Sequence, residues 1–465
     1  MISNVAWLTQ TEKNERLNDI EWLALRIATS GTPAPDQQRA ISLHIVDTLG
    51  ALVAGAATDE GRMLLAMRRA ERKAAGADGS DPALDLMIRC ALARLSEVDN
   101  IHRAAMVTPG AIVVPAVLTL AQSAGADAAS MMAAINAGYE AIIRLGCGIK
   151  GPAILGRGIW PTYFATPFAV AAAAARLWTL DPHQTAHAMA IALTYSAPTV
   201  GRPAGATTSR WLAVGQAARN GLAAASAARF GFTGDLGLLQ DDVLEKTRGL
   251  AFDTQVFRAN PDLAVMHEVS FKPRCAAKQT MSATHALHNF IEQGLDPASI
   301  GQITVRVPTV YAGMIGHNAQ PGNRSSHLTS LRYQMALTAL APDQALNVNQ
   351  SPGTRADRLY EFGERINVDM ADELQRHYPA RWPAEIQLIT CSGETRSALV
   401  LSTPGDPELP MTEHELIGKF ERLVSNVVQR PGSILRAGKA VLNEHNDMLG
   451  LMELVEGVLQ EAEHA

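Results

Sequence analysis

The feature that most constrains the fold is a succession of helical patterns between about residue 17 and about residue 250. In residues 35–55, PDQQRAISLHIVDTLGALVAG, apolar residues recur every three or four positions, after an initial proline and aspartate and before a final glycine. Residues 110–125, 130–148 and 210–231 follow the same rules. Small residues dominate these segments and aromatic residues make up only 5% of the chain, so the helices can approach one another closely. The pattern predicts a large, all-helical domain.

The pattern changes after about residue 265. Residues 302–308, QITVRVP, alternate apolar and polar side chains as a half-buried strand does, and residues 385–403, EIQLITCSGETRSALVLST, are typical of two strands joined by a turn. Amphipathic helix returns near the C-terminus. We therefore expect a mainly α protein in which residues 1–265 and 406–465 form the helical domain and residues 266–405 form a smaller α+β lid domain. The cleft between the two is the expected ligand site.

Composition and charge exclude several classes of protein. The 465 residues carry a formal net charge of −6, which leaves no electrostatic footprint for nucleic acid. The first residues lack the charged start and apolar core of a signal peptide, and no uncharged apolar run reaches the roughly 18 residues of a membrane span. The four cysteines are scattered without a C-x-x-C pair, as is usual for reduced thiols. These observations predict a soluble, cytoplasmic protein with neither a membrane nor a nucleic-acid partner.

The sequence contains no recognisable cofactor or metal motif. The glycines of GRPAGATTSR, residues 201–210, follow a helical pattern and lack the lysine of a phosphate-binding loop. There is no H-E-x-x-H, no paired-cysteine motif and no nucleophile elbow. We therefore expect chemistry that needs neither a cofactor nor a metal ion. The loop of residues 201–210 also carries Arg202 and Arg210, which would either bind carboxylates or face solvent.

The stretch SEVDNIHRAAMVTP, residues 96–109, places an acid, an amide and a histidine ahead of an apolar run. Asp99 and His102 are candidates for an acid–base pair, because a carboxylate orients a nearby imidazole and raises its pKa. The alternative is a helix end that Asp99 or Asn100 caps while His102 faces solvent.

Residues 156–167, GRGIWPTYFATP, combine two glycines with Trp160, Pro161 and Tyr163. Proline is favoured at the first position of a helix, and the free amides at that end attract a carboxylate. A rigid turn with Trp160 packed in the core is the alternative.

Basic residues gather in FKPRCAAKQTM, residues 271–281, where the helical pattern gives way to the strand pattern. Lys272, Arg274 and Lys278 would suit a substrate with several carboxylates. Lys272 is also a candidate base, because like-charge repulsion from Arg274 and Lys278 would lower its pKa. A solvated basic turn is the alternative.

Taken in order, several stretches resemble the MmgE/PrpD family along nearly the whole chain. They are HIVDTLGALVAG, TPGAIVVPAVLTLAQ, AGYEAIIRLG, PTYFATPFAVAAAAARL, GQAARNGLAAASAARFGFTG, FKPRCAAKQTMSATHAL and SLRYQMALTAL. The resemblance implies a helical domain, an α+β lid, a homodimer, and residues 96–109 and 271–280 at one active cleft. It also implies an enzyme that acts on a small polycarboxylate, since 2-methylcitrate dehydratase, cis-aconitate decarboxylase and iminodisuccinate epimerase belong to the family.

The chain departs from the dehydratase and decarboxylase pattern of that family. Thr108 and Trp160 stand where those members have histidines, and Arg210 stands where they have a lysine. Lys272 matches, but the histidine expected soon after it is missing near residues 276–277. Dehydration needs an acid for the departing hydroxide as well as a base, whereas epimerisation needs only proton removal and return, with cations to stabilise the enolate-like intermediate. The departures therefore favour an epimerase.

The expected activity is cofactor-independent epimerisation at a carbon alpha to a carboxylate, in a small polycarboxylate such as iminodisuccinate. A hydro-lyase or decarboxylase acting on a tricarboxylate and a catalytically inactive polycarboxylate-binding homologue are the alternatives. The candidate catalytic residues are Lys272, Tyr163, His102, Asp99, Tyr139 and Lys150. The candidate substrate-binding residues are Arg202, Arg210, Arg274, Lys278 and Trp160.

Overall fold

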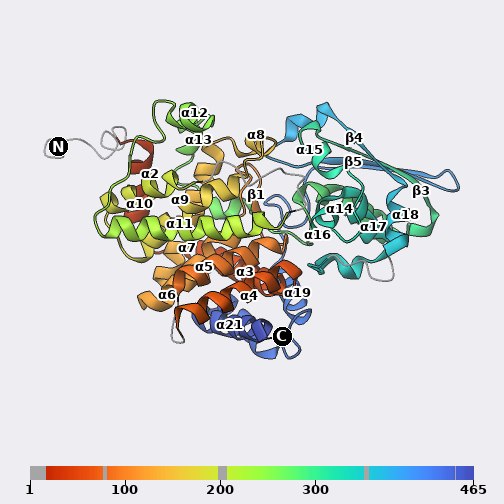
Figure 1. Cartoon of the computed structure of the whole chain (residues 1–465). Coiled ribbons are helices and arrows are strands. Elements are labelled where there is room, and N and C mark those ends of the chain that lie inside the picture. Colours follow the sequence, from red (N-terminus) through yellow and green to blue (C-terminus); the bar gives the residue numbers. More distant parts are fainter. Residues whose placement is uncertain (1–16, 77–80, 197–206, 350–355, 446, 465) are drawn as a thin grey trace.

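The computed structural model describes residues 17–76, 81–196, 207–349, 356–445 and 447–464. A large helical body occupies one side of the molecule, and a smaller body with a mixed sheet occupies the other (Figure 1). The expected fold class, mainly α with a smaller α+β domain, is confirmed.

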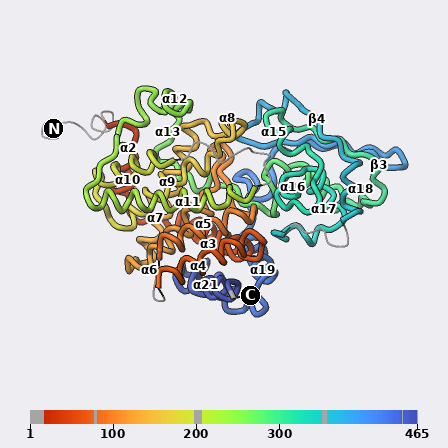
Figure 2. Tube along the Cα trace, viewed as in Figure 1, coloured from red at the N-terminus to blue at the C-terminus, as the bar shows by residue number. Residues whose placement is uncertain are grey.

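The helical body contains elements from both ends of the chain. Its earlier helices are α2 (Asp19–Thr29), α3 (Pro35–Ala56), α4 (Asp59–Ala75), α5 (Pro82–Leu95), α6 (Gly110–Ala124), α7 (Ala128–Gly148), α8 (Gly151–Leu155), α9 (Pro161–Leu177), α10 (Pro182–Thr194), α11 (Ser209–Arg229), α12 (Val243–Arg248), α13 (Thr254–Phe257) and the 3-10 helix η1 (Val265–Glu268). The chain returns to this body in α19 (Glu413–Ser425), α20 (Gly432–Glu444) and α21 (Met448–His464). Figure 2 shows the blue C-terminal trace beside the red and orange trace of α3 and α4, and α19 and α21 both contact α3. The domain boundaries expected from the sequence stay a prediction.

Local signals set the helix ends, and small residues set their spacing. Asn18 Oδ1 accepts the backbone N–H of Glu21 at 2.9 Å, while Glu21 Oε2 accepts the N–H of Asn18 at 3.2 Å, a reciprocal cap at the start of α2. A Cβ atom on Gly55 of α3 would lie only 2.0 Å from the carbonyl O of Leu92 on α5. A residue with a side chain is therefore excluded at this position, and α3 and α5 touch backbone to backbone.

The smaller body covers one face of a mixed sheet with helices. Its strands are β3 (Ile300–Val307), β4 (Ile366–Met370), β5 (Ala384–Thr390) and β6 (Thr395–Val400), in the order β4-β3-β5-β6. β3 pairs parallel with β4 and antiparallel with β5, which pairs antiparallel with β6. The remaining elements are η2 (Lys278–Thr280), α14 (Met281–Glu292), η3 (Pro297–Ser299), α15 (Thr309–Ile315), α16 (Arg324–Thr329), α17 (Leu331–Leu340), η4 (Pro342–Leu346), α18 (Ala356–Gly363) and η6 (Asp372–His377). β3, β5 and β6 lie where alternation predicts strands, whereas β4 has no such signal.

Each body has its own hydrophobic core. The larger core combines side chains of α2 to α11 with those of α19 to α21, and the smaller one lies between the sheet and α14, α17 and α18. A small third cluster, which includes Ala54, Val98, Cys275, Leu346 and Leu423, lies between the two. Because Val98 and Cys275 flank the candidate site residues Asp99 and Lys272 in sequence, this third cluster places the candidate site at the junction of the two bodies.

Among the described helices, α3 alone is long and apolar enough to cross a membrane by length and composition. However, 83% of its most apolar 18-residue window is buried inside the molecule. Such burial is usual for a core helix, since a core helix and a membrane span share length and composition.

Candidate functional site

A short antiparallel ribbon joins two segments that lie far apart in the chain. β1 (Ile101–His102) pairs with β2 (Val269–Ser270), with Ile101 opposite Ser270. The same register, continued by two residues, brings Asp99 opposite Lys272. Residues 96–109 and 271–280 are therefore neighbours at this ribbon.

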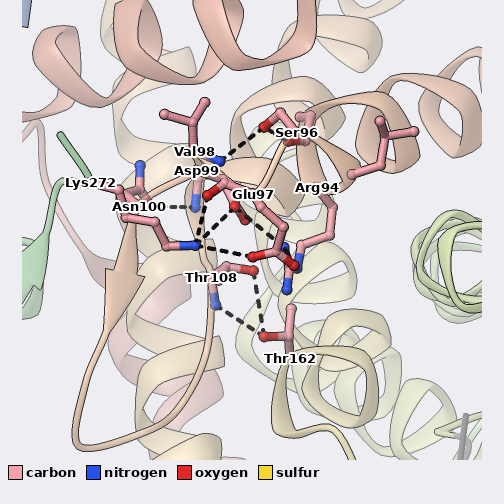
Figure 3. Close-up of polar contacts among 12 residues, drawn as sticks. Arg94, Ser96, Glu97, Val98, Asp99, Asn100, Thr108, Thr162 and Lys272 are labelled. Carbon is pink, nitrogen blue, oxygen red and sulfur yellow. Dashed lines mark hydrogen bonds and ion pairs between the residues drawn. The ribbon is translucent and has the colours of Figure 1, made fainter. Parts of the chain in front are cut away.

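Lys272 lies against two carboxyl groups (Figure 3). Its Nζ is 3.3 Å from Glu97 Oε2 and 3.5 Å from Asp99 Oδ1. Arg94, in the last turn of α5, reaches the same pair: its Nη1 is 2.9 Å from Glu97 Oε1 and 3.3 Å from Asp99 Oδ1. Lys272 and Asp99 are only 2% and 0% exposed. We call Arg94, Glu97, Asp99 and Lys272 the Lys272 cluster.

The chain enters this cluster through a left-handed residue. Glu97 has a φ of 55°, which is uncommon for a residue with a side chain. Ser96 Oγ donates to the carbonyl O of Ala93 at 2.7 Å and accepts the N–H of Val98 at 3.3 Å, so its hydroxyl closes the turn after α5. The side chains of Glu97 and Asp99 leave this turn toward Lys272 (Figure 3). Unusual backbone beside buried charges is often found at functional sites.

The two carboxyl groups of the cluster differ in their affinity for a proton. Burial opposes ionisation of Glu97, but Arg94 and Lys272 outweigh it and lower the pKa of Glu97 to about 2. Burial raises the pKa of Asp99 above its usual range, despite the attraction of Arg94 and Lys272. Asp99 Oδ2 has no hydrogen-bond partner in the described part of the chain. Adjacent carboxyl groups whose pKa values are pushed apart can serve as one charged group and one proton carrier.

The start of α9 lies beside the cluster. Thr162 Oγ1 accepts the backbone N–H of Thr108 at 3.1 Å, which ties α9 to the segment after β1 (Figure 3). Tyr163 is 2% exposed. Burial raises the pKa of Tyr163, and Arg94 and Glu97 of the cluster are among the charges that act on it. The tyrosine therefore shares the electrostatic environment of the Lys272 cluster.

Trp160 and Arg210 complete this side of the site. The Trp160 ring centroid is 5.2 Å from that of Tyr163, and the Arg210 guanidinium carbon lies 5.2 Å from the Trp160 ring centroid. The Tyr163 hydroxyl and Trp160 Nε1 are buried, and neither has a hydrogen-bond partner among the described residues. Since buried polar groups are normally hydrogen-bonded, unpartnered groups beside a charged cluster suggest the place of a polar ligand.

His102 has a different environment from the one expected of an acid–base partner. Its Nδ1 accepts the backbone N–H of Ala105 at 3.0 Å, and the side chain is only 6% exposed. Burial and then Arg103 lower the pKa of His102 to about 4. Asp99 contacts Arg94 and Lys272. The alternative to the acid–base pair was a helix end capped by Asp99 or Asn100, with His102 exposed. Asn100 Oδ1 does accept the N–H of Gly110, at the start of α6, at 3.0 Å. His102, however, is buried and not exposed.

Two other candidate proton carriers lie apart from the cluster. Tyr139 is buried on α7, with its ring centroid 5.1 Å from that of His44. Lys150 lies at the surface, where 56% of its side chain is exposed and its Nζ is 3.8 Å from Asp253 Oδ2. The structure therefore places Tyr139 against His44 in the core and Lys150 at the surface beside Asp253. Arg202 lies outside the described residues.

The positions expected for Arg274 and Lys278, directly beside Lys272, need correction. Arg274 Nη1 donates to Thr338 Oγ1 of α17 at 2.6 Å, so this side chain points into the smaller body. Lys278 Nζ lies 2.6 Å from Asp406 Oδ1 and donates to Thr403 Oγ1 at 2.6 Å. The side chains of these cations diverge along the chain, and the groups within 3.5 Å of Lys272 Nζ are the acids Glu97 and Asp99 and the carbonyl O of Glu97. Lys278 still repels Lys272, because Lys272 is among the charges that lower the pKa of Lys278. This repulsion acts at a distance, whereas the direct neighbours of Lys272 Nζ are acids.

Sequence reasoning missed several residues of the site. Arg94 and Glu97 carry a local signal, because charges spaced three apart at the end of an apolar helix can pair. Asp47 and Lys419 carry none: they form a buried ion pair across 372 positions of the chain. In the described parts of the chain no group of three or more His, Cys, Asp or Glu side chains is arranged to hold a metal ion.

Comparison with known families agrees with this arrangement. The family model for the MmgE/PrpD N-terminal domain matches residues 21–258, and the model for the MmgE/PrpD C-terminal domain matches residues 275–442. A comparison with curated proteins gives no match. The two family matches together cover most of the chain, and residues 259–274 between them include β2 and Lys272. The chain therefore belongs to the MmgE/PrpD family, whose members are generally enzymes of the dehydratase, epimerase or decarboxylase type.

Proposed function

We propose that this enzyme is a cofactor-independent isomerase that epimerises a carbon alpha to a carboxylate in a small polycarboxylate such as iminodisuccinate. The observation that carries the proposal is the Lys272 cluster beside Tyr163, whose buried hydroxyl has no partner in the described part of the chain. Epimerisation removes a proton from one side of a carbon and returns one to the other side, so it needs two proton carriers. The Lys272 cluster and Tyr163 come from different elements and offer such a pair.

The charges around the site suit the intermediate of this reaction. Removing a proton next to a carboxylate spreads negative charge onto the carboxylate oxygens, and fixed cations lower the energy of that state. Arg94 and Lys272 supply buried positive charge, and Arg210 supplies more beside Trp160. Glu97, held ionised by Arg94 and Lys272, fixes both cations in place, while Asp99 takes part in proton transfer with Lys272.

A hydro-lyase remains the second candidate, and one observation favours it. Loss of a hydroxide ion needs a general acid, and the missing family histidines remove the usual ones. Asp99 offers another, because burial raises its pKa and its Oδ2 has no hydrogen-bond partner among the described residues. In that reaction Lys272 would hold a substrate carboxylate and Asp99 would protonate the departing hydroxyl.

Incubation of candidate substrates in deuterated water separates these functions. Iminodisuccinate stereoisomers and methylcitrate are each mixed with the protein, and the Cα proton signal, the optical rotation and the ultraviolet absorbance are followed together. An epimerase replaces the Cα proton by deuterium and changes the rotation without forming a double bond. A new absorbance from a double bond would instead establish the hydro-lyase. Tight binding without either change would leave a binding homologue that has lost catalysis.

The assembly and location of the protein stay part of the proposal. We expect a homodimer in the cytoplasm that takes a small polycarboxylate and binds no nucleic acid or membrane. Light scattering after size-exclusion chromatography measures the oligomeric state directly.

A further inference from the structure

A second buried lysine lies directly behind the Lys272 cluster. Lys419, on α19, is 1% exposed. Its Nζ donates to Asp47 Oδ1 at 2.5 Å and to the carbonyl O of Val98 at 2.9 Å. Val98 separates Glu97 from Asp99 in the chain. The Lys419 ammonium group, from one of the C-terminal helices, therefore holds the backbone between Glu97 and Asp99 by a hydrogen bond to the Val98 carbonyl.

The segment that carries the acids is held from this same side at its next residue. Asn100 Oδ1 accepts the N–H of Gly110, and Asn100 Nδ2 lies 3.1 Å from His44 Nδ1 on α3. The His44 ring in turn stacks on Phe271, with centroids 4.6 Å apart. Residues 97–100 thus present the Glu97 and Asp99 side chains to Lys272, while the Val98 carbonyl and the Asn100 side chain face supporting groups.

The supporting pair also belongs to the electrostatics of the site. Burial raises the pKa of Asp47 while Lys419 opposes this, and Asp99 is among the groups that raise it further. Asp47 and Asp99 are therefore coupled, since an electrostatic interaction acts equally on both partners. Among the described residues, the titratable and charged groups around Asp99 include Arg94 and Glu97 near the end of α5, Lys272 after β2, Tyr163 on α9, and Asp47 on α3 with its partner Lys419 on α19.

We propose that Lys419 and Asp47 are positioning residues that hold the Val98 carbonyl, and with it the Glu97 and Asp99 side chains, in place against Lys272. This role rests on the proposed function, because it matters for turnover only if these acids and Lys272 act on a substrate. Neither residue touches substrate: both act through the backbone of residues 97–99 and through the field at Asp99.

The structural part of the proposal is tested without a substrate. The double variant Asp47→Asn with Lys419→Gln removes both charges and leaves neutral side chains that can hydrogen-bond to each other, so the fold should persist. Hydrogen–deuterium exchange of peptides covering residues 96–103 should become about 10-fold faster, because the grip on Val98 is lost. The matched control is Glu421→Gln, which breaks a surface pair with Lys439 on the same side of the molecule and should change nothing there. Unchanged exchange at residues 96–103 in the double variant would overturn the positioning role.

The functional part is tested by the pH dependence of Cα proton exchange. Lys419→Gln removes the cation that offsets the Asp47 carboxylate, so the charge near Asp99 becomes more negative and Asp99 becomes harder to ionise. The acid limb of the exchange rate should move to higher pH in the single variant and return toward the wild-type position in the double variant, with KM nearly constant and kcat reduced about 10-fold or more in both. A merely structural role would leave the acid limb where it is, which would refute this inference. If the wild-type protein exchanges no polycarboxylate proton, the proposed function fails, and the hydrogen–deuterium exchange result alone decides the positioning role.

Discussion

The same two chain segments build two buried lysine sites that differ in one important respect. Lys272 lies 3.3 and 3.5 Å from its acids. Lys278, six positions later, lies 2.6 Å from Asp406 and donates to Thr403 at 2.6 Å. Arg103 adds a second cation at Asp406, at 3.5 Å. Charge-assisted hydrogen bonds are strong at short distances and weak beyond about 3.2 Å.

The comparison separates a lysine that supports the fold from the lysine proposed to react. The short contacts of Lys278 connect the segment after β2 to residues 403–406, where the chain begins its return to the helical body. Arg103, after β1, reaches the same Asp406. The longer contacts of Lys272 are weaker hydrogen bonds than those of Lys278. Two lysines of similar burial thus differ in the length of their contacts, and this difference predicts opposite responses to mutation.

The largest expected effect is on stability, at Lys278. Lys278→Met leaves Asp406 buried with only a distant cation, and breaking a buried pair in this way costs about 3–5 kcal/mol. Urea denaturation measures the free energy of unfolding. A loss below about 1 kcal/mol would show that the Lys278 contacts do not support the fold, and the comparison between the two lysines would break.

The second effect is on turnover, at Lys272. Lys272→Arg keeps the charge beside Glu97 and Asp99 but cannot release a proton near neutral pH. Substrate affinity should change little, while Cα proton exchange should fall by roughly 100-fold or more, the usual scale of acid–base catalysis. Calorimetric binding and exchange in deuterated water are measured on one preparation. Near-normal exchange in this variant would transfer the base role to Asp99 or Tyr163.

A third effect separates the two faces of the substrate, at Tyr163. Tyr163→Phe removes a hydroxyl that has no hydrogen-bond partner among the described residues, so stability should stay within about 1 kcal/mol of wild type. Inversion of the Cα centre should fall about 100-fold. Exchange of the Cα proton with retention should persist for one of the two stereoisomers, because the Lys272 cluster can still remove and return a proton on the side of Cα that it faces. Equal loss of both would mean that Tyr163 is not a separate proton carrier.

A fourth, smaller effect concerns acid stability. The folded-state pKa of Glu97, at about 2, lies below its usual value. The ionised Glu97 side chain therefore contributes its full stabilisation of the fold above about pH 4.5. As the pH falls toward 2, this contribution of roughly 1–3 kcal/mol is lost. Asp99 affects stability in the opposite direction. Because its pKa is raised in the folded protein, its contribution to stability falls as the pH rises. Glu97→Gln should make unfolding free energies less dependent on pH between about 4.5 and 2.5. The same slope in variant and wild type would contradict the pairing of Glu97 with Arg94 and Lys272.

The smallest effect is expected at Lys150, which serves as the exposed control for both buried lysines. Lys150→Gln removes a surface charge 3.8 Å from Asp253, and such pairs contribute little. Stability should stay within about 0.5 kcal/mol, and Cα exchange should match the wild type. A clear loss of turnover would return Lys150 to the candidate site.

Local patterns predicted much of the fold. Helices such as α3 and α11 were predicted from the 3.6-residue period, the prolines at helix starts and the density of small residues. The alternation of apolar and polar residues predicted β3, β5 and β6. β4 was not predicted, because the segment of residues 366–370, INVDM, is short and lacks a clear alternation of apolar and polar residues. It forms a strand because it pairs with the neighbouring strand β3. Of the residues in and behind the candidate site, Lys272, Asp99 and Tyr163 were candidates from the sequence, whereas Lys419 and Asp47 were not.

The sequence by itself determined the helical texture, the ends of several helices and the family to which the chain belongs, because these depend on residues a few positions apart or on ordered motifs. Only the tertiary structure decided which charges meet. Lys272, Arg274 and Lys278 are three similar cations in one short stretch, yet they face Glu97, Thr338 and Asp406 respectively. Their partners lie on other elements, and the direction of each side chain follows from the path of its backbone through the junction of the two bodies. A pairing such as Lys419 with Asp47 depends on the global arrangement of α19 and α3, which no local pattern encodes.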